Sequence, residues 1–324
     1  MAQQNKKTLA FNGDEAVAFA VKQCNVDVVA AYPITPQTII VERFSEYVAN
    51  GEVQTQFVCT ESEHSAITAS LSASTTGART FTASASAGLA LMHEMLFVTS
   101  GSRAPVVMAI ANRALSAPLN IHGDHSDSMA QRDSGWIQIY VENAQEAYDS
   151  IIQAYKIAES CDVSLPTMVG LDGFTLSHSL ENVDILSDEA VTDFIGERQL
   201  PQVLTHEGKS VPFKLDPKNP MTMGPVAFQN YYFEFKRQQE EGMKNALKRI
   251  QEVNSEFAKI SGRCYGNGLI DKYKLEDAEV IVVCAGSTSG TLKVIVDELR
   301  ACGVKAGLLR LRTFRPLPVE DLKN

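Results

Sequence analysis

Strand-like and helical segments alternate through the first half of this 324-residue chain, and this alternation constrains its fold more than any other feature. Amphipathic helical patterns, such as that of Ala144 to Ser160, separate the strand-like segments. These strand-like segments are apolar runs at Val28 to Tyr32, Val53 to Cys59, Arg79 to Ala83, Val106 to Ala111, Ile137 to Val141 and Pro166 to Leu171. Apolar strands joined through helices are typical of a mostly parallel sheet with helices on both faces. The sequence therefore predicts a doubly wound α/β fold.

The regular alternation ends after Asp172. Five of the twelve prolines lie between Leu200 and Pro225, which predicts an extended arm rather than a packed element. A charged helical pattern follows from about Asn230 to Ile260. We expect this helix to close a first domain over residues 1–255.

A second α/β unit is expected over residues 256–324. It contains a strand at Ala278 to Cys284, a helix at Thr291 to Cys302 and a strand at Val304 to Arg312. Two strands and one helix do not make a stable domain by themselves. We therefore expect this second domain to be incomplete at its C-terminal end and to be completed by further chain or by another subunit.

Composition and charge disfavour several classes of function. With 44% apolar and 21% charged residues, a chain of this length buries a large core and exceeds the usual limit for a single one. The net charge of -10 would cause repulsion from nucleic acid and from anionic membrane surfaces. The N-terminal residues lack the apolar core of a signal peptide, and no segment is apolar for long enough to cross a bilayer. We expect a cytoplasmic enzyme that binds neither nucleic acid nor membrane.

The six cysteines are widely spaced and form no C-x-x-C pair. They are Cys24, Cys59, Cys161, Cys264, Cys284 and Cys302. This pattern is typical of reduced thiols in a reducing compartment, and we expect the side chains to be buried. Because iron–sulfur clusters need closely spaced thiolates, this chain is not expected to hold a cluster alone.

Three side chains suited to catalysis or binding follow strand-like segments. Thr35, Glu63 and Arg113 each stand shortly after the end of an apolar run. In a parallel sheet the carboxyl ends of the strands meet at one edge, and ligands bind there. A carboxylate in a dry pocket can move protons, and a planar guanidinium can bind a carboxylate through two hydrogen bonds.

Each of these three residues also has a purely structural interpretation. Thr35 is suited to be the N-cap of a helix with Pro36 at its first position. Glu63 could complement the dipole of a helix in its first turn, and Arg113 could be a surface arginine. The residues alone leave both interpretations open.

The small residues from Ser84 to Gly88 lie between a strand and a helix. Ser86 and Gly88 would let the backbone approach a ligand closely, but tight packing of the helix on the sheet explains them equally well. Neither glycine-rich phosphate motif, G-x-x-x-x-G-K-[ST] or G-x-G-x-x-G, is present, so phosphate binding is only weakly indicated.

A different class of function is suggested by four residues within a span of six, His122, Asp124, His125 and Asp127. Such side chains could bind a metal ion in a hydrolase. The remaining histidines show no matching spacing, so the metallohydrolase is the weaker hypothesis.

The segments AYPITP (31–36) and CTESEH (59–64), followed by the small-residue tract from Ser70 to Gly88, closely resemble the start of the α subunit of 2-oxoacid:ferredoxin oxidoreductases, typified by pyruvate synthase. The resemblance covers nearly the whole chain. It implies a thiamine pyrimidine-binding domain followed by a transketolase C-terminal-like domain. It also implies a subunit of an enzyme that reversibly and oxidatively decarboxylates pyruvate, or a related 2-oxoacid, to acyl-coenzyme A and CO2, with electrons passing to ferredoxin.

The resemblance assigns roles to single residues. Glu63 would be the catalytic carboxylate that contacts the aminopyrimidine of thiamine diphosphate, and Ser86 and Gly88 would line the cofactor site. Thr35 and Arg113 would bind the substrate.

The segment GDH-x-D (123–127) would flank this active site, with Asp124 and Asp127 making structural hydrogen bonds. A noncatalytic assembly subunit that keeps the same fold remains an alternative function. The metallohydrolase ranks below both.

The Gly-Asp-Gly signature with which thiamine enzymes bind the diphosphate through Mg²⁺ is missing, because Gly13-Asp14 continues with Glu and Gly123-Asp124 with His. The resemblance therefore implies that thiamine diphosphate is shared with a partner β subunit, which holds the diphosphate and Mg²⁺. Gamma and delta subunits, or fused ferredoxin-like subunits, would hold the iron–sulfur clusters and much of the site for the co-substrate coenzyme A. Ferredoxin would be the electron acceptor.

Overall fold

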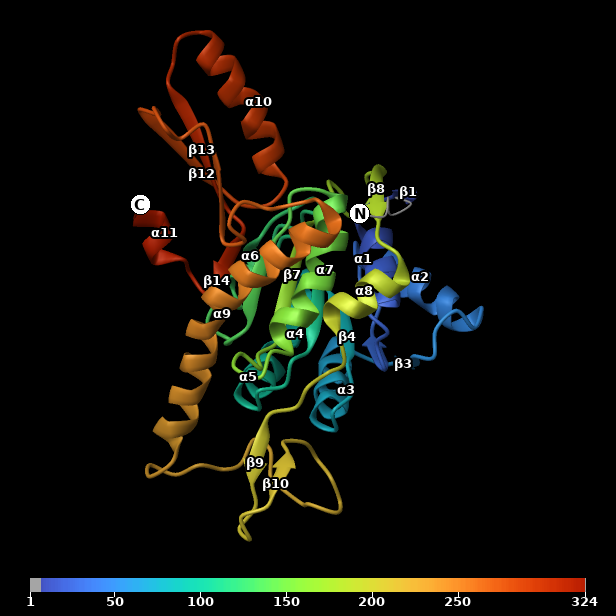
Figure 1. Ribbon diagram of the computed structural model, residues 1–324. Helices are drawn as coiled ribbons and strands as arrows, with labels where there is room; N and C mark the ends of the chain where they lie inside the picture. Colours follow the sequence, from blue (N-terminus) through green and yellow to red (C-terminus); the bar gives the residue numbers. More distant parts are fainter. Residues whose placement is uncertain (1–6, 324) are drawn as a thin grey trace.

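A central seven-stranded sheet organises the protein, whose computed structural model describes residues 7–323 (Figure 1). The strand order is β14-β6-β7-β5-β4-β2-β3. Six strands are parallel: β2 (Val28–Ala31), β3 (Gln56–Cys59), β4 (Thr80–Ser84), β5 (Val107–Asn112), β6 (Ile137–Tyr140) and β7 (Thr167–Asp172). The short strand β14 (Thr313–Arg315) pairs antiparallel with β6. The predicted mostly parallel α/β sheet is confirmed.

Helices cover both faces of this sheet. They are α1 (Gly13–Gln23), α2 (Thr38–Ala49), α3 (Glu63–Thr75), α4 (Ser86–Leu91), α5 (His93–Gly101), α6 (Ser126–Met129), α7 (Ala144–Ala158), α8 (Asp188–Ile195) and α9 (Tyr232–Ser261). Side chains of β5 alternate between two cores, since Val107 packs with α1 and α7 while Met108 packs with α3, α4 and α5. A fully buried, apolar strand of this kind is expected at the centre of a parallel sheet.

Smaller sheets surround the central one. Strand β1 (Lys7–Phe11) pairs antiparallel with β8 (Glu181–Ile185). The predicted arm contains the hairpin of β9 (Gln202–Leu204) and β10 (Ser210–Pro212), which projects from the body of the protein (Figure 1). The charged helix predicted after the arm is present as α9 (Figure 1).

The C-terminal part of the chain forms a three-stranded sheet in the order β11-β13-β12, covered by α10 (Thr288–Ala301). Its strands are β11 (Ile270–Tyr273), β12 (Val280–Cys284) and β13 (Ala306–Leu311), and the chain continues into α11 (Val319–Lys323). Strand β11 is absent from the sequence expectation because it is only four residues long, and its two successive charged residues, Asp271 and Lys272, break any alternation of polar and apolar side chains. Strand β14 returns the chain to the central sheet, so the division at residue 255 stays a prediction.

The cysteines are more exposed than expected. Only Cys24 is buried, whereas Cys59, Cys161, Cys264 and Cys302 are exposed and Cys284 is intermediate. Cys59 ends the edge strand β3, and Cys302 is the C-cap of α10, which explains their exposure. Among residues 7–323, no helix is both long and apolar enough to span a bilayer.

Candidate active site

The carboxyl ends of the parallel strands form a ligand-binding edge at a point where the strand order reverses. From β2 the chain passes to β3 on one side, and β4 lies on the other side of β2. Open α/β sheets bind ligands in the crevice at such a point. Thr35, Glu63, Ser86 and Arg113 follow β2, β3, β4 and β5 respectively, so the structure brings these predicted residues to one edge.

Glu63 is a buried carboxylate at the start of α3, with 6% of its surface exposed. Ser62 caps the helix by accepting a hydrogen bond from Ser65 N at 3.2 Å. Gly88 is needed here, because a Cβ atom at this position would clash with Glu63 Oε1 and lie 2.7 Å from Ser84 Oγ. The neighbouring Glu61 is exposed and accepts a hydrogen bond from the Ser65 hydroxyl, so its carboxylate is engaged away from Glu63.

Ser84 leaves a polar atom unused beside Glu63. Its Oγ is buried and has no hydrogen-bond partner within residues 7–323. A buried hydroxyl without a partner costs free energy, so it is a place where a polar ligand atom would be accepted. Glu63, Ser84 and Gly88 together make a small cradle with a carboxylate, a free hydroxyl and no obstructing side chain.

Ser86 shapes the site through its backbone. It has φ of +44°, its backbone N–H donates to Asp127 Oδ2 at 2.9 Å, and its hydroxyl donates to Ala114 O at 2.6 Å. The protein itself therefore satisfies the hydroxyl. The predicted role of Ser86 in cofactor binding stays a prediction, and it would act through the shape of the turn.

Arg113 reaches across the edge to the segment after β2. Its Nη1 donates to the backbone oxygen of Thr35 at 2.6 Å, while its Nε is buried and without a partner in the described part of the chain. The side chain of Thr35 is exposed. One guanidinium nitrogen thus fixes the orientation of the group, and the buried Nε is left without a partner among the described residues.

The interpretation of Thr35 as an N-cap is wrong. Helix α2 begins at Thr38, and its N-cap is Gln37. The Gln37 side chain is buried and donates to Ala83 O at 2.8 Å, which ties the segment after β2 to β4. The sequence reasoning missed this glutamine, whose only signal is a polar residue directly after Pro36 at the start of an apolar helix.

Asp127 connects the segments around Arg113. Its carboxylate accepts hydrogen bonds from Asn112 Nδ2, Arg113 N, Ser86 N and Ser128 N at 2.8, 3.0, 2.9 and 2.7 Å. Burial raises the pKa of Asp127, although these donors oppose the shift. Asp124 Oδ1 accepts from Ser126 N at 2.7 Å. The structural hydrogen bonds expected for both aspartates are present.

The structure does not support the metallohydrolase hypothesis. In residues 7–323, no group of three or more histidine, cysteine or acidic side chains is placed to hold a metal ion. His122 packs against the ring of Phe174, and Asp127 is committed to backbone and amide donors.

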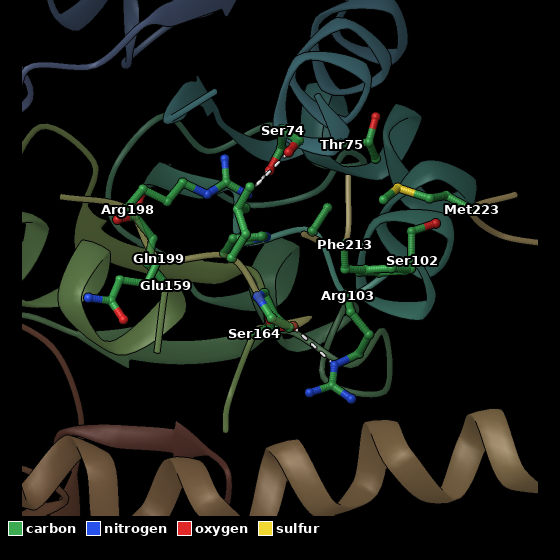
Figure 2. Close-up of a pocket in the computed structure, with 14 residues that line it drawn as sticks. Ser74, Thr75, Ser102, Arg103, Glu159, Ser164, Arg198, Gln199, Phe213 and Met223 are labelled. Carbon is green, nitrogen blue, oxygen red and sulfur yellow. Dashed lines mark hydrogen bonds between the residues drawn. The ribbon is translucent and has the colours of Figure 1, made fainter. Parts of the chain in front are cut away.

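A small cavity lies at the opposite edge of the sheet, under the arm (Figure 2). Arg198 binds Ser74 there, and Arg103 Nε donates to Ser164 O at 3.1 Å (Figure 2). The cavity encloses about 20 Å³, which is enough for a water molecule but not for a cofactor. Its arginines fasten the arm and the segments before β5 and β7, so we assign this cavity a structural role.

Comparison with known proteins identifies the class of this site. The family model for the thiamine diphosphate-binding domain of pyruvate flavodoxin/ferredoxin oxidoreductases matches residues 19–255. The model for core domain II of pyruvate:ferredoxin oxidoreductase matches residues 278–324. The site therefore belongs to a thiamine diphosphate-binding domain, with which the buried carboxylate and the cradle at Ser84 and Gly88 are consistent.

Curated relatives agree with this assignment. The chain is 55% identical over 312 residues to pyruvate synthase subunit PorA of Methanocaldococcus jannaschii, covering 96% of this chain and 78% of the relative. It is 50% identical over 316 residues to subunit PorA of Thermotoga maritima, covering 98% and 78%. It is 44% identical over 311 residues to ketoisovalerate oxidoreductase subunit VorA of Pyrococcus horikoshii, covering 96% and 76%.

A solved structure supports the fold. The 2-oxoglutarate:ferredoxin oxidoreductase from Magnetococcus marinus, with 2-oxoglutarate, coenzyme A and succinyl-CoA bound, superposes with a TM-score of 0.79 at 22% identity. The match covers 98% of this chain and 56% of that one, so this chain spans little more than half of the larger protein.

The chain belongs to the pyruvate flavodoxin/ferredoxin oxidoreductase family, as an α subunit of the 2-oxoacid:ferredoxin oxidoreductases. The resemblance drawn from the sequence is thereby confirmed.

Proposed function

We propose that this chain is the subunit of a pyruvate:ferredoxin oxidoreductase that binds the pyrimidine half of thiamine diphosphate and the carboxylate of the 2-oxoacid. The reaction is the reversible oxidative decarboxylation of the 2-oxoacid to acyl-coenzyme A and CO2, with electrons passing to ferredoxin. The observation that carries this proposal is the buried Glu63 beside the unpaired Ser84 hydroxyl, at the edge where Arg113 and Thr35 also lie.

Glu63 is the catalytic residue in this proposal. When bound, thiamine diphosphate supplies the carbon centre on which decarboxylation depends. Glu63 holds and moves a proton at N1′ of the aminopyrimidine, a role that requires a carboxyl group shielded from bulk water. Its 6% exposure meets this requirement, and Gly88 leaves the carboxylate free of a covering side chain.

Arg113 and Thr35 bind the substrate in this proposal. The unpaired Nε of Arg113 gives the guanidinium a free donor toward a carboxylate, while its Nη1 is held by Thr35 O. The exposed hydroxyl of Thr35 faces solvent at the same edge and suits a substrate oxygen. Charge-assisted hydrogen bonds of this kind are stronger than neutral ones.

A partner β subunit covers this edge and brings the diphosphate and Mg²⁺. The missing Gly-Asp-Gly signature supports this assignment. Exposed apolar side chains flank the edge, with Tyr32, Leu91, Leu119 and Ile121 exposed to 36%, 53%, 59% and 41%. Clustered exposed apolar residues mark protein contacts. Further subunits, gamma and delta or their fused equivalents, carry the iron–sulfur clusters and much of the coenzyme A site.

Pyruvate is the proposed substrate because identity is higher to the two pyruvate synthase subunits, at 55% and 50%, than to the ketoisovalerate enzyme, at 44%. The whole complex, supplied with a series of 2-oxoacids, coenzyme A and a one-electron acceptor, tests this choice. The highest kcat/KM for a branched 2-oxoacid would contradict it.

The isolated chain is expected neither to decarboxylate 2-oxoacids nor to carry iron–sulfur clusters. The reason is that it has only part of the cofactor site and no closely spaced cysteines. Visible absorption and turnover are measured before and after the partner subunits are added. Turnover by the chain alone would contradict the shared site.

Arg113→Ala is expected to raise the KM for the 2-oxoacid about tenfold to a hundredfold, because a charge-assisted contact to substrate contributes roughly 1.5 to 3 kcal/mol. Lysine should restore binding only in part, since a point charge cannot reproduce the planar fork. Affinity for thiamine diphosphate, measured in parallel, should change little. An unchanged KM in a folded, cofactor-loaded complex would remove Arg113 from the site.

The alternative function, a noncatalytic assembly subunit, predicts different effects of these variants on activity. Under that alternative, variants of Glu63 and Arg113 that assemble normally would leave the activity of the complex intact.

A further inference from the structure

Asp172, the last residue of β7, joins two parts of the molecule through one carboxylate. Its Oδ1 lies 2.5 Å from His125 Nε2, in the segment that leads from Arg113 to α6. Its Oδ2 accepts hydrogen bonds from Ser287 N, at 2.8 Å, and from the Ser287 hydroxyl. Ser287 is the N-cap of α10, which covers the C-terminal sheet. One side chain of the central sheet therefore holds both the active-site segment and the C-terminal unit.

Two glycines allow these segments to approach Asp172. A Cβ atom on Gly123 would lie 2.9 Å from Asp172 Cβ. A Cβ atom on Gly286 would lie 2.9 Å from Asp172 Oδ2 and 2.9 Å from His125 Cε1, and Gly286 has φ of +70°. Side chains at these positions would push the segments apart. The packing around the carboxylate is therefore close on both sides.

The arrangement is not that of a nucleophilic triad. In such a triad the histidine lies between the hydroxyl and the carboxylate. Here Ser287 and His125 each bind the carboxylate of Asp172, so the carboxylate is the central group. This geometry holds segments together and does not activate the serine.

The hydrogen bonds of Asp172 fix one end of a loop beside Arg113, the residue proposed to bind the substrate. The loop of residues 114–124 directly follows Arg113, whose backbone N–H donates a hydrogen bond to Asp127 Oδ2 at 3.0 Å. It ends at His125, which is fixed by Asp172. Asp172 also lies next to the start of the loop, because β7 pairs with β5 and Asn112 is its partner in register.

We propose that Asp172 is a positioning residue for substrate binding, which fixes the loop of residues 114–124 through His125 and makes its placement depend on the C-terminal unit through Ser287. The proposal rests on the proposed function in one respect, the assignment of Arg113 to the substrate carboxylate. In the reaction, Asp172 touches neither substrate nor cofactor.

The surroundings of His125 favour its charged form and therefore an ion pair with Asp172. Burial lowers the pKa of His125, but the hydrogen bond and charge of Asp172 outweigh this and raise the pKa above its usual value. Burial raises the pKa of Asp172, but its contacts with His125 and Ser287 lower it overall. Asp124 and Asp127 also favour charged His125. The Tyr140 ring packs against the imidazole from β6 with its phenol protonated.

This charge state predicts a pH dependence with a definite sign. The pair is fully charged below the usual pKa of histidine and weakens as pH rises through the raised pKa of His125. The KM for the 2-oxoacid should therefore increase at pH values above the pKa of His125. His125→Gln, which keeps a donor but does not titrate, should remove this rise.

Asp172→Asn in the full complex is the main test. We expect the KM for the 2-oxoacid to rise about twofold to thirtyfold with a smaller change in kcat, the range found for residues that act through their neighbours. Hydrogen–deuterium exchange should become faster in residues 114–124 and at the start of α10. Exchange does not depend on turnover, so it tests the positioning even if the assignment of Arg113 fails.

Lys293→Met is the matched control. Lys293 on α10 pairs with Glu142 at 2.8 Å, so this variant also removes a contact between α10 and the segment after β6 but leaves Asp172 untouched. It should change neither KM nor exchange in the loop. Equal effects of Asp172→Asn and Lys293→Met would mean that Asp172 contributes only to general packing, which would contradict the proposal. Unchanged hydrogen–deuterium exchange of residues 114–124 in Asp172→Asn would also overturn it.

Discussion

Replacing Glu63 by glutamine is expected to lower turnover of the complex by about 10² to 10⁴, because an amide cannot move a proton at the aminopyrimidine. The buried position at the start of α3 suits this role, and glutamine fills the same volume, so the fold should survive. Turnover is measured by reduction of a one-electron acceptor with saturating 2-oxoacid and coenzyme A.

Glu61→Gln provides the control for this variant. Glu61 is exposed, and its carboxylate accepts a hydrogen bond from the Ser65 hydroxyl, away from the cradle at Ser84 and Gly88. Its substitution should leave turnover close to that of the wild type. Similar losses in both variants would point to a general effect on α3 instead of proton transfer.

Glu146→Ala is expected to lower the free energy of unfolding by roughly 3 to 5 kcal/mol, because it leaves the buried charge of Arg312 without a carboxylate partner and Arg310 with Glu142 alone. Glu146 on α7 is fully buried and binds Arg310, and its Oε1 lies 2.7 Å from Arg312 Nε. Arg310 lies in β13 and Arg312 directly after it, so this ion cluster joins the C-terminal unit to α7, which packs on the central sheet. Denaturant-induced unfolding measures the loss.

The control for this prediction is an exposed ion pair. Glu240→Ala on α9 removes a partner of Lys244 at 3.9 Å, and an exposed pair of this kind contributes about 0 to 1 kcal/mol. Equal losses for Glu146→Ala and Glu240→Ala would contradict the role given to the buried cluster.

The buried cluster also predicts an acid sensitivity. Burial raises the pKa of Glu146, but the charges of Arg310 and Arg312 outweigh this and lower it overall. A carboxyl group whose pKa is lowered by folding contributes stability above its unfolded pKa, which is lost as pH falls through the folded pKa. The stability difference between the wild type and Glu146→Ala should therefore shrink on acidification, and unfolding curves measured over a pH series check this.

Much of the fold and the placement of the candidate site could be predicted from strand ends. Apolar runs of four to six residues define the parallel strands, and parallel strands bring their carboxyl ends together. This rule alone placed Thr35, Glu63 and Arg113 at one edge. The charged pattern of α9 was equally informative, because its polar face continues over many turns.

Features that depend on distant contacts could not be predicted. The Gln37 amide donates to the backbone oxygen of Ala83 in the neighbouring strand β4, a contact that the local sequence does not reveal. Local capping rules therefore placed the helix start at Thr35, whereas the N-cap is Gln37. The short strand β14 forms only because β13 leads the chain back to β6. Asp172 likewise gains its partner Ser287 from a segment 115 residues away.

The exchange rate of the C2 proton of thiamine diphosphate in the assembled complex tests the central claim most directly. If Glu63 moves the proton at N1′, exchange should be fast in the wild type and in Glu61→Gln and slower by about 10² or more in Glu63→Gln. Exchange in Glu63→Gln as fast as in the wild type, with the cofactor bound, would contradict the assignment of this chain as the pyrimidine half of the site.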